Sequence, residues 1–223
     1  MKNPVFKRVP EKELMDDVAQ ATAYANANFE EPHNHFVELL SLSMGENFPE
    51  SGNAIDLGTG AADIAIRFAS NYSCFEVDAI DGSCAMIDEG KKAIDKLRLN
   101  DRINLIHSSI QDITLAEKEY AIVFSNSLLH HLHDPMVLWK LIKNAKGNPL
   151  VFIMDLMRPK NIQKIDELVH EYAGNEPEIL QKDFKNSLKA AFTPEEVVLQ
   201  LQDIGLDGLK VTVVSDRHIV VSN

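Results

Sequence analysis

A short segment near residue 56 combines two glycines with two carboxylates. It reads Asp56-Leu57-Gly58-Thr59-Gly60-Ala61-Ala62-Asp63. Glycines between a strand and a helix let the backbone approach a ligand closely. No lysine follows as in a phosphate loop, and Asp63 stands where the dinucleotide fingerprint needs a small residue. The segment therefore favours a cationic ligand over a pyrophosphate, although Asp63 could equally be an exposed carboxylate at a helix start.

A second carboxylate, Asp81, lies 25 positions after Asp56 and ends the next apolar run. An acid at about this spacing can accept hydrogen bonds from ribose hydroxyls. The alternative is that Asp81 caps the helix expected from Ser83. Met86, one helical turn further on, could pack against an adenine ring or belong to the core.

Three histidines and an acid follow the fourth apolar run, at His130, His131, His133 and Asp134. Adjacent histidines on a short helix are expected to point in different directions, and no second cluster of ligands is evident, so we predict no metal site. A histidine with an ordinary pKa near 6.5 can act as a general base. We take His131 as the candidate base, with a packing or lid role as the alternative.

Polar residues also end the fifth apolar run, in Asp155-Leu156-Met157-Arg158-Pro159. Asp155 could accept a proton or orient a nucleophile, and Arg158 could bind an anionic substrate through its guanidinium fork. The alternative is that Asp155 and Arg158 pair with each other. On the substrate side we also place His130, and Tyr24 from an N-terminal helix that could cover the site.

The elements that must position these residues alternate between short apolar runs and amphipathic segments. This order predicts a doubly wound, mostly parallel α/β sheet covered on both faces, with ligands beyond the carboxyl ends of the strands. The first fifty residues look helical, with Leu14, Met15 and Val18 at helical spacing. The expected strands cover residues 54–57, 75–80, 103–106, 120–124, 150–154, 209–214 and 219–221, and the last two form an antiparallel hairpin.

Composition excludes several classes of protein. The 223 residues carry a formal charge of −12, which disfavours nucleic acid as a partner. No apolar run reaches the ~18–20 residues of a membrane span, and residues 1–4 do not begin a secretory signal. Two cysteines cannot build a disulfide framework. We therefore expect a cytoplasmic, acidic protein that binds neither nucleic acid nor membranes; its oligomeric state stays open.

Three motifs in order carry a family resemblance. They are Asn-Ala-Ile-Asp-Leu-Gly-Thr-Gly (53–60), Ala-Ile-Asp-Gly-Ser-Cys-Ala-Met (79–86) and Ser-Asn-Ser-Leu-Leu-His-His-Leu (125–132), the last followed by Asp134-Pro135. Together they resemble the class I S-adenosylmethionine-dependent methyltransferases, especially the branch of ubiquinone and menaquinone C-methylases. The resemblance covers about residues 50–155. It implies a seven-stranded sheet in the order 3-2-1-4-5-7-6.

The resemblance also implies a cofactor site for S-adenosyl-L-methionine, with S-adenosyl-L-homocysteine as the product. The glycine turn would hold the methionine part, and Asp81 would bind the ribose. Two residue pairs would contact the adenine and the sulfonium end, respectively Ser109 with Ile110 and Asn126 with Ser127. The full implied set is Asp56, Gly58, Thr59, Gly60, Asp81, Met86, Ser109, Ile110, Asn126 and Ser127.

The sequence departs from other methyltransferase branches at the end of the fourth strand. Enzymes that methylate DNA amino groups or protein glutamine carry Asn/Asp-Pro-Pro-Tyr/Phe there, whereas Asn126 is followed by Ser-Leu-Leu. The resemblance therefore points to in-line methyl transfer to a small molecule. The alternatives are a non-catalytic protein, an enzyme that binds a modified form of the cofactor, and an NAD-dependent oxidoreductase.

One methyltransferase domain is expected over residues 1–223. Residues 1–50 would form a helical lid, and residues 51–160 the cofactor-binding core. Residues 161–192 would be a helical insert, and residues 193–223 the closing helix and hairpin.

Overall fold

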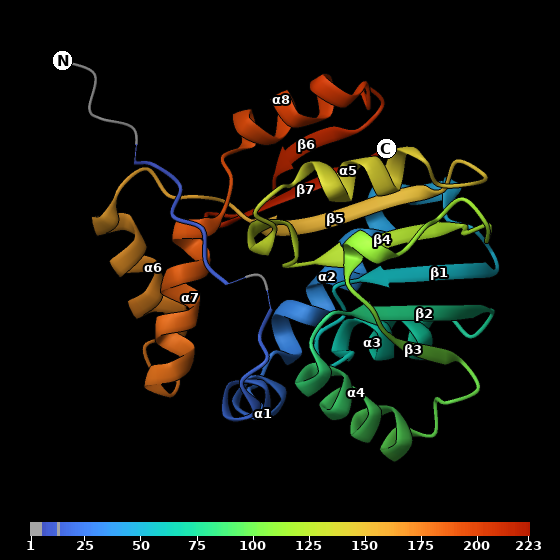
Figure 1. The fold of residues 1–223 in the computed structure, drawn as a ribbon, viewed down its shortest axis with the longest axis horizontal. Coiled ribbons are helices and arrows are strands. Elements are labelled where there is room, and N and C mark those ends of the chain that lie inside the picture. Colours follow the sequence, from blue (N-terminus) through green and yellow to red (C-terminus); the bar gives the residue numbers. More distant parts are fainter. Residues whose placement is uncertain (1–5, 13) are drawn as a thin grey trace.

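A single seven-stranded sheet organises the computed structural model, which describes residues 6–12 and 14–223. Its strand order is β3-β2-β1-β4-β5-β7-β6, as predicted, and β7 is antiparallel to both of its neighbours (Figure 1). Strands β1 to β5 pair with one another in parallel. The strands are β1 (Gly52–Leu57), β2 (Phe75–Asp81), β3 (Ile103–His107), β4 (Ile122–Asn126), β5 (Leu150–Leu156), β6 (Lys210–Val213) and β7 (His218–Ser222).

The helices begin and end largely where the sequence pattern placed them. Thr193 and Glu196 form the predicted capping box, and Gly205 ends that helix in a left-handed conformation. The predicted insert consists of two helices, α6 and α7. The α-helices are α1 (Val18–Asn26), α2 (Glu30–Met44), α3 (Asp63–Asn71), α4 (Cys84–Leu97), α5 (Met136–Lys143), α6 (Ile162–Ala173), α7 (Glu178–Ala190) and α8 (Pro194–Ile204), and the 3-10 helices are η1 (Gly45–Asn47), η2 (Ile110–Asp112) and η3 (Leu129–His131).

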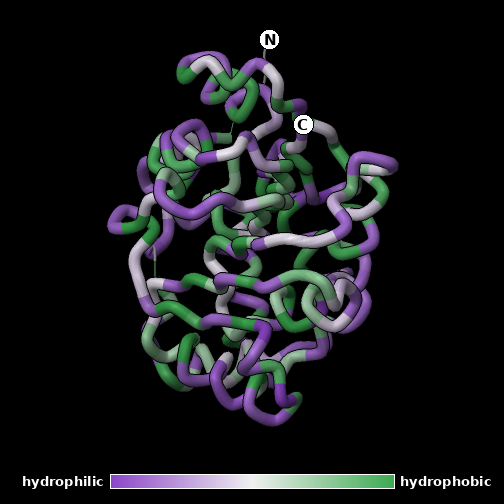
Figure 2. Tube along the Cα trace, turned by 90° about the vertical axis from the view of Figure 1, so that its right-hand side faces the viewer, coloured by the Kyte–Doolittle hydropathy of each residue, from purple (hydrophilic) through white to green (hydrophobic). Residues whose placement is uncertain are grey.

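The sheet buries a hydrophobic core on each face. Neighbouring strand residues alternate between the two cores: Phe124 and Phe152 belong to the one that includes α2 and α3, and Val123 and Val151 to the one that includes α5 and α8. Hydrophobic and hydrophilic stretches accordingly alternate along the surrounding helices (Figure 2). Because both faces are covered, a ligand can reach the sheet only at its ends.

The N-terminal region differs from its prediction. Helix α1 begins only at Val18, because the Asp17 side chain accepts a hydrogen bond from the Gln20 backbone and starts the helix there. Leu14 and Met15 therefore lie outside the helix. We call residues 6–12 and 14–17 the N-terminal strap; residues 1–5 and 13 of the predicted lid, with the residues examined for a secretory signal, lie outside the described residues.

The strap and the helices α1, α6 and α7 gather beyond the carboxyl ends of the parallel strands (Figure 1). The strap is bound to α7, since the Val9 backbone N–H donates to the Lys189 carbonyl. Helix α7 in turn contacts α1 and η3. Within the described residues no helix is both long and apolar enough to span a membrane. These elements enclose the edge of the sheet where the candidate residues lie.

Candidate active site

The glycine turn after β1 has the open backbone that its sequence suggested. Gly58 and Gly60 have φ angles of 73° and 55°, in the left-handed region that favours glycine. The backbone N–H groups of Gly58 and Thr59 both donate to the Ile80 carbonyl of β2. A Cβ on Gly60 would meet no atom within 4 Å. The turn is therefore fixed to the sheet and leaves space beside Gly60 for a ligand.

Asp56 lies buried beneath this turn. Its side chain is 1% exposed and accepts a hydrogen bond of 2.7 Å from the Thr59 hydroxyl. Burial raises the pKa of Asp56 to about 7, against the opposing effect of the Thr59 hydrogen bond. A cation bound nearby would favour the ionised carboxylate, so a cationic ligand would lower the pKa of Asp56.

Asp81 connects the glycine turn with the start of α4. One carboxylate oxygen accepts from the Gly60 backbone N–H and the other from the Ser83 backbone N–H, each at 2.8 Å. The helix cap is Ser83, whose hydroxyl accepts from the Met86 backbone, so the alternative of Asp81 as the cap is wrong. Burial raises the pKa of Asp81. The carboxylate retains lone pairs for ligand hydroxyls.

A cavity of about 1,990 Å³ collects most of the predicted residues at the carboxyl edge of the sheet. It exceeds the roughly 300–1,000 Å³ of an ordinary small-molecule pocket, so it offers room for a cofactor and a second molecule. Asp155 and Arg158 are not among its lining residues. The predicted residues that line it are Tyr24, Asp56, Gly58, Thr59, Gly60, Asp81, Met86, Ser109, Ile110, Asn126, Ser127, His130 and His131.

Asp63 has two partners that the sequence reasoning missed. His33 of α2 lies 2.5 Å from its carboxylate, and Arg67 donates to the same oxygen at 2.9 Å. Burial opposes ionisation, but these hydrogen bonds outweigh it and hold the pKa of Asp63 below its ordinary value. The acid thus connects α2 with the start of α3. The spacing of four residues between Asp63 and Arg67 could have predicted their ion pair from the sequence. Nothing in the sequence around His33 indicated its contact with Asp63.

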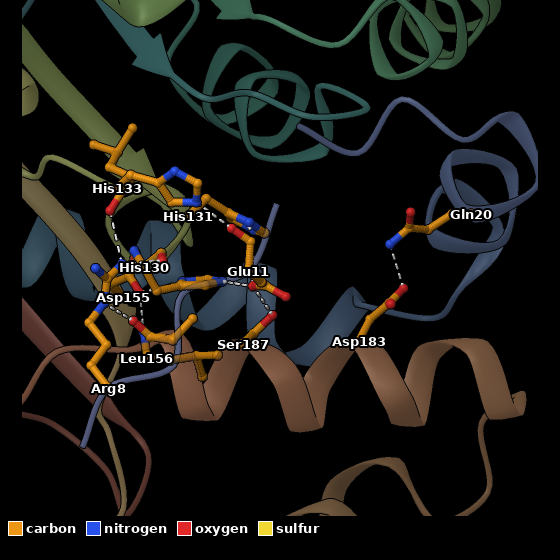
Figure 3. Close-up of polar contacts among 12 residues, drawn as sticks. Arg8, Glu11, Gln20, His130, His131, His133, Asp155, Leu156, Asp183 and Ser187 are labelled. Atoms are coloured by element: carbon orange, nitrogen blue, oxygen red, sulfur yellow. Dashed lines mark hydrogen bonds and ion pairs between the residues drawn. The ribbon is translucent and has the colours of Figure 1, made fainter. Parts of the chain in front are cut away.

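The histidine pair forms the opposite end of the cavity, beyond β4 and β5 (Figure 3). His130 is buried, and its Nδ1 lies 2.6 Å from the Asp155 carboxylate. Burial lowers the pKa of His130, but the carboxylates of Asp155 and Glu11 together raise it more, so the net shift is upward. Burial and the neighbouring His130 lower the pKa of His131 to about 3. Asp155 therefore orients His130, while His131, the predicted base, is the weaker base of the two.

Glu11 of the strap completes this end of the cavity and was absent from the sequence reasoning. Its carboxylate lies 3.4 Å from His131 Nδ1 and 3.7 Å from His130 Nε2 (Figure 3). The two histidine rings are 4.2 Å apart between centroids and face the same carboxylate. The expectation that adjacent histidines point in different directions is therefore wrong for this pair.

Arg158 has a partner other than the one considered for it. Its guanidinium is buried, donates to the Ala191 carbonyl and forms an ion pair of 2.5 Å with Glu196. The alternative of an Asp155–Arg158 pair is wrong, since Asp155 contacts His130. Arg158 joins the end of β5 to the start of α8 outside the cavity lining.

Tyr24 of α1 lies over the cofactor half of the cavity. Its ring packs against Phe29 with 4.8 Å between centroids. Burial and three nearby carboxylates, led by Asp63, raise the pKa of Tyr24 to about 12. Tyr24 therefore remains a neutral phenol that can donate a hydrogen bond into the cavity.

Comparison with known proteins agrees with this geometry in the central part of the chain. Residues 54–146 match the family model described as a methyltransferase domain. A release factor glutamine methyltransferase of Rhodopirellula baltica is 30% identical over 76 residues, or 34% of this chain and 26% of that protein. A tRNA1(Val) (adenine(37)-N6)-methyltransferase of Pedobacter heparinus is 34% identical over 89 residues, 40% of this chain and 36% of that protein. The matches thus span about a quarter to a third of these relatives.

Solved structures share the fold over nearly the whole chain. A putative S-adenosylmethionine-dependent methyltransferase of Methanococcus maripaludis superposes with a TM-score of 0.72 at 18% identity, covering 96% of both chains. The plantazolicin methyltransferase BpumL, solved with S-adenosylhomocysteine, gives a TM-score of 0.67 at 15% identity over 92% of this chain and 90% of that one. The family match and the shared fold do not support the alternative of an NAD-dependent oxidoreductase. Residues 54–146 thus match a methyltransferase domain, and the chain as a whole has the fold of S-adenosylmethionine-dependent methyltransferases.

Proposed function

We propose that the chain binds S-adenosyl-L-methionine along the glycine turn and transfers its methyl group to a small molecule at the histidine end of the same cavity. One observation carries this proposal. The open backbone at Gly60 with Asp81, which follow β1 and end β2, and the polar group of His130 and His131, which follow β4, line one cavity. Asn126 and Ser127, at the end of β4, come after Asp81 and before His130 in the sequence. In the sheet, β4 lies between β1 and β5.

The residues present fit this cofactor. Asp81 would accept hydrogen bonds from the ribose hydroxyls, and Asp56 would face the cationic methionine end once ionised. When bound, S-adenosylmethionine supplies an electrophilic methyl carbon whose bond to sulfur breaks as the acceptor's lone pair forms the new bond. The protein then needs mainly to align the acceptor and exclude water, which suits an enclosed cavity.

Within this proposal Asp155 is a positioning residue and His130 faces the acceptor. Asp155 Oδ1 holds His130 Nδ1, so the other ring nitrogen, Nε2, is directed toward Glu11 and the cavity. The predicted base, His131, lies beside it. Arg158 forms part of the support behind the site, because its ion pair with Glu196 occupies its guanidinium.

A small acceptor is favoured over a macromolecule by the end of β4 and by charge. The curated relatives act on release factor glutamine and on tRNA adenine, as their names state. Here Asn126 is followed by Ser127-Leu128-Leu129 in place of the Pro-Pro-aromatic sequence expected of enzymes that methylate protein glutamine. A net charge of −12 also opposes the approach of RNA. The C-methylase branch and a cytoplasmic location remain predictions.

Titration calorimetry with S-adenosylmethionine tests cofactor binding. Asp81→Asn should weaken binding at least tenfold, since it removes a charged acceptor from the ribose site. Glu76→Gln is the matched control: it neutralises an exposed acid on the same strand, outside the cavity, and should bind normally. Absence of binding by the native chain, or equal binding by both variants, would refute the proposed cofactor site.

The acceptor class needs a second experiment. The native chain is incubated with S-adenosylmethionine labelled on its methyl group and with three substrate pools: small metabolites, total tRNA and total protein. We expect label in the metabolite pool alone. Label in tRNA or protein would contradict the small-molecule proposal, and binding with no label in any pool would favour the non-catalytic alternative.

A further inference from the structure

Three side chains at the histidine end of the cavity form a group with the composition of a metal site. Glu11, His130 and His131 each offer one ligand atom, and all three atoms lie within 4.8 Å of one another (Figure 3). Two of the separations are 3.4 Å and 3.7 Å, both measured to one Glu11 oxygen. Tetrahedral ligands bound at 2.0–2.1 Å lie about 3.3 Å apart. The group is therefore close to the spacing that a bound ion would impose.

Hydrogen bonds already hold two of these side chains in place. Asp155 bonds His130 Nδ1 at 2.6 Å, and this carboxylate is itself fixed by the Leu156 backbone N–H at 2.7 Å. The Ser187 hydroxyl donates at 2.9 Å to Glu11 Oε1, the same oxygen that faces the two histidines. A histidine whose far nitrogen is bonded to a carboxylate presents its remaining nitrogen as a ligand, and this second shell is typical of protein metal sites.

One ligand atom of the group lacks a hydrogen bond in the present arrangement. His131 Nδ1 is buried and is the buried side-chain nitrogen or oxygen without a hydrogen-bond partner among the described residues. Its 3.4 Å separation from Glu11 is an ion-pair distance without hydrogen-bond geometry. Buried polar atoms are nearly always partnered, so the unpartnered nitrogen calls for an explanation. A bound cation would supply the missing partner.

We propose that Glu11, His130 and His131 bind one divalent transition-metal ion, with Zn²⁺ as the best match to two imidazoles and a carboxylate. Three protein ligands leave a coordination position for another molecule, and the histidines line the cavity. The ion would hold an oxygen or nitrogen of the acceptor beside the ends of β4 and β5. This last role rests on the proposed function; metal binding itself does not.

The alternative is a closed ionic cluster that fastens the strap. Glu11 and Asp155 flank His130 from opposite sides, and a protonated His130 could link them without any metal. Both arrangements predict that loss of Glu11 loosens the strap. They differ in whether the purified chain takes up a metal and in what His131 contributes, because only the metal site needs His131 Nδ1.

The test is metal titration of the intact, untagged chain after dialysis against a chelator. Calorimetry with Zn²⁺ should give one ion per chain at micromolar affinity or tighter, and Co²⁺ should give visible absorption bands from an ordered site. His131→Ala and Glu11→Gln should each weaken Zn²⁺ binding at least tenfold, and Asp155→Asn should weaken it 10–100-fold. His170→Ala, which removes an exposed histidine of α6 outside the cavity, should change nothing.

Two outcomes would overturn the proposal. One is no uptake of Zn²⁺ or Co²⁺ by the native chain, and the other is unchanged uptake by both His131→Ala and Glu11→Gln. Thermal unfolding checks that the variants fold, and Glu11→Gln on the half-exposed strap serves if the histidine variant does not. S-adenosylmethionine titration of the same samples separates the two proposals, since failure of either ligand to bind leaves the other result standing.

Discussion

The two ends of the cavity are built in opposite ways. At the cofactor end, the key hydrogen bonds join residues close in sequence: Thr59 to Asp56 across 3 positions and Gly60 to Asp81 across 21. At the histidine end the His130–Asp155 bond spans 25 positions, but the bonds of the strap join distant parts, with Arg8 bonded to His130 across 122 positions and Ser187 to Glu11 across 176. The cofactor end is therefore a property of one strand–helix–strand unit (β1, α3 and β2), whereas the histidine end exists only once the strap, η3 and α7 have packed together.

The largest loss of folding stability is expected for Gly58→Ala, in the glycine turn at the cofactor end. A Cβ there would lie 2.8 Å from Leu128 at a φ of 73°, so strain and overpacking together should cost about 3 kcal/mol of stability. Gly60→Ala has the same type of backbone but open space around the new methyl, and should cost only about 1 kcal/mol. Denaturant unfolding measures both; equal losses would contradict the packing argument.

A smaller loss is expected at the histidine end, from Arg8→Met. The Arg8 guanidinium donates to the carbonyls of Ala190, His130 and Leu132, and these bonds hold the strap against η3 and α7. Removing them should cost about 1–2 kcal/mol and speed hydrogen exchange in the strap. Lys7→Met, at an exposed neighbour, is the control. Unchanged exchange in Arg8→Met would show that other contacts hold the strap.

The pH dependence of cofactor binding tests the buried acid of the first end. With a pKa of about 7, Asp56 is largely protonated in the free protein at pH 6, and a bound cation favours its ionised form. Affinity for S-adenosylmethionine should therefore rise about tenfold from pH 6 to pH 8 and then level off. Asp56→Asn should flatten this profile. A rise that persists in the variant would assign the titration to another group.

The same pKa has the opposite consequence for folding. Because the folded-state pKa of Asp56 is raised, the folded chain binds the proton more tightly than the unfolded chain between about pH 4 and pH 7. Stability from this group is present at low pH and falls as pH rises through that window. Asp56→Asn should therefore gain stability relative to the native chain on going from pH 5 to pH 8, as followed by urea unfolding.

The smallest effect is expected for Asp63→Asn, beside the turn. The pKa of Asp63 is lowered, so its contribution is present above about pH 4 and is lost as pH falls through the folded-state value. The side chain is 41% exposed, so solvent screening limits the cost at pH 7 to less than about 1 kcal/mol. Unfolding at pH 7 and pH 3 should show a smaller difference from the native chain at the lower pH. Asp95→Asn, an exposed acid of α4, is the control.

The contrast between the two ends also explains what the sequence could predict. The glycine turn between a strand and a helix was predicted from a local pattern, and the strand order was implied by the family resemblance; the structure confirms both. Glu11 and His33 could not be found, because nothing in their neighbourhoods marks them: each acquires its partner through packing of a distant element. The prediction that Leu14 and Met15 belong to a helix is wrong, because apolar residues at helical spacing also occur in the strap. The side-chain cap of Asp17 starts α1 only after them.

The position of β7 has a consequence for the order in which the molecule folds. This strand lies between β5 and β6, and it is later in the chain than both, so β6 has no place in the sheet until β7 has formed. The hairpin of β6 and β7 must then dock on β5 as one unit across a gap that includes α6, α7 and α8. Closing so long a loop is slow, because its entropy is lost before the contacts between β7 and β5 stabilise the fold. Substitutions in this hairpin should mainly speed unfolding and leave the folding rate little changed.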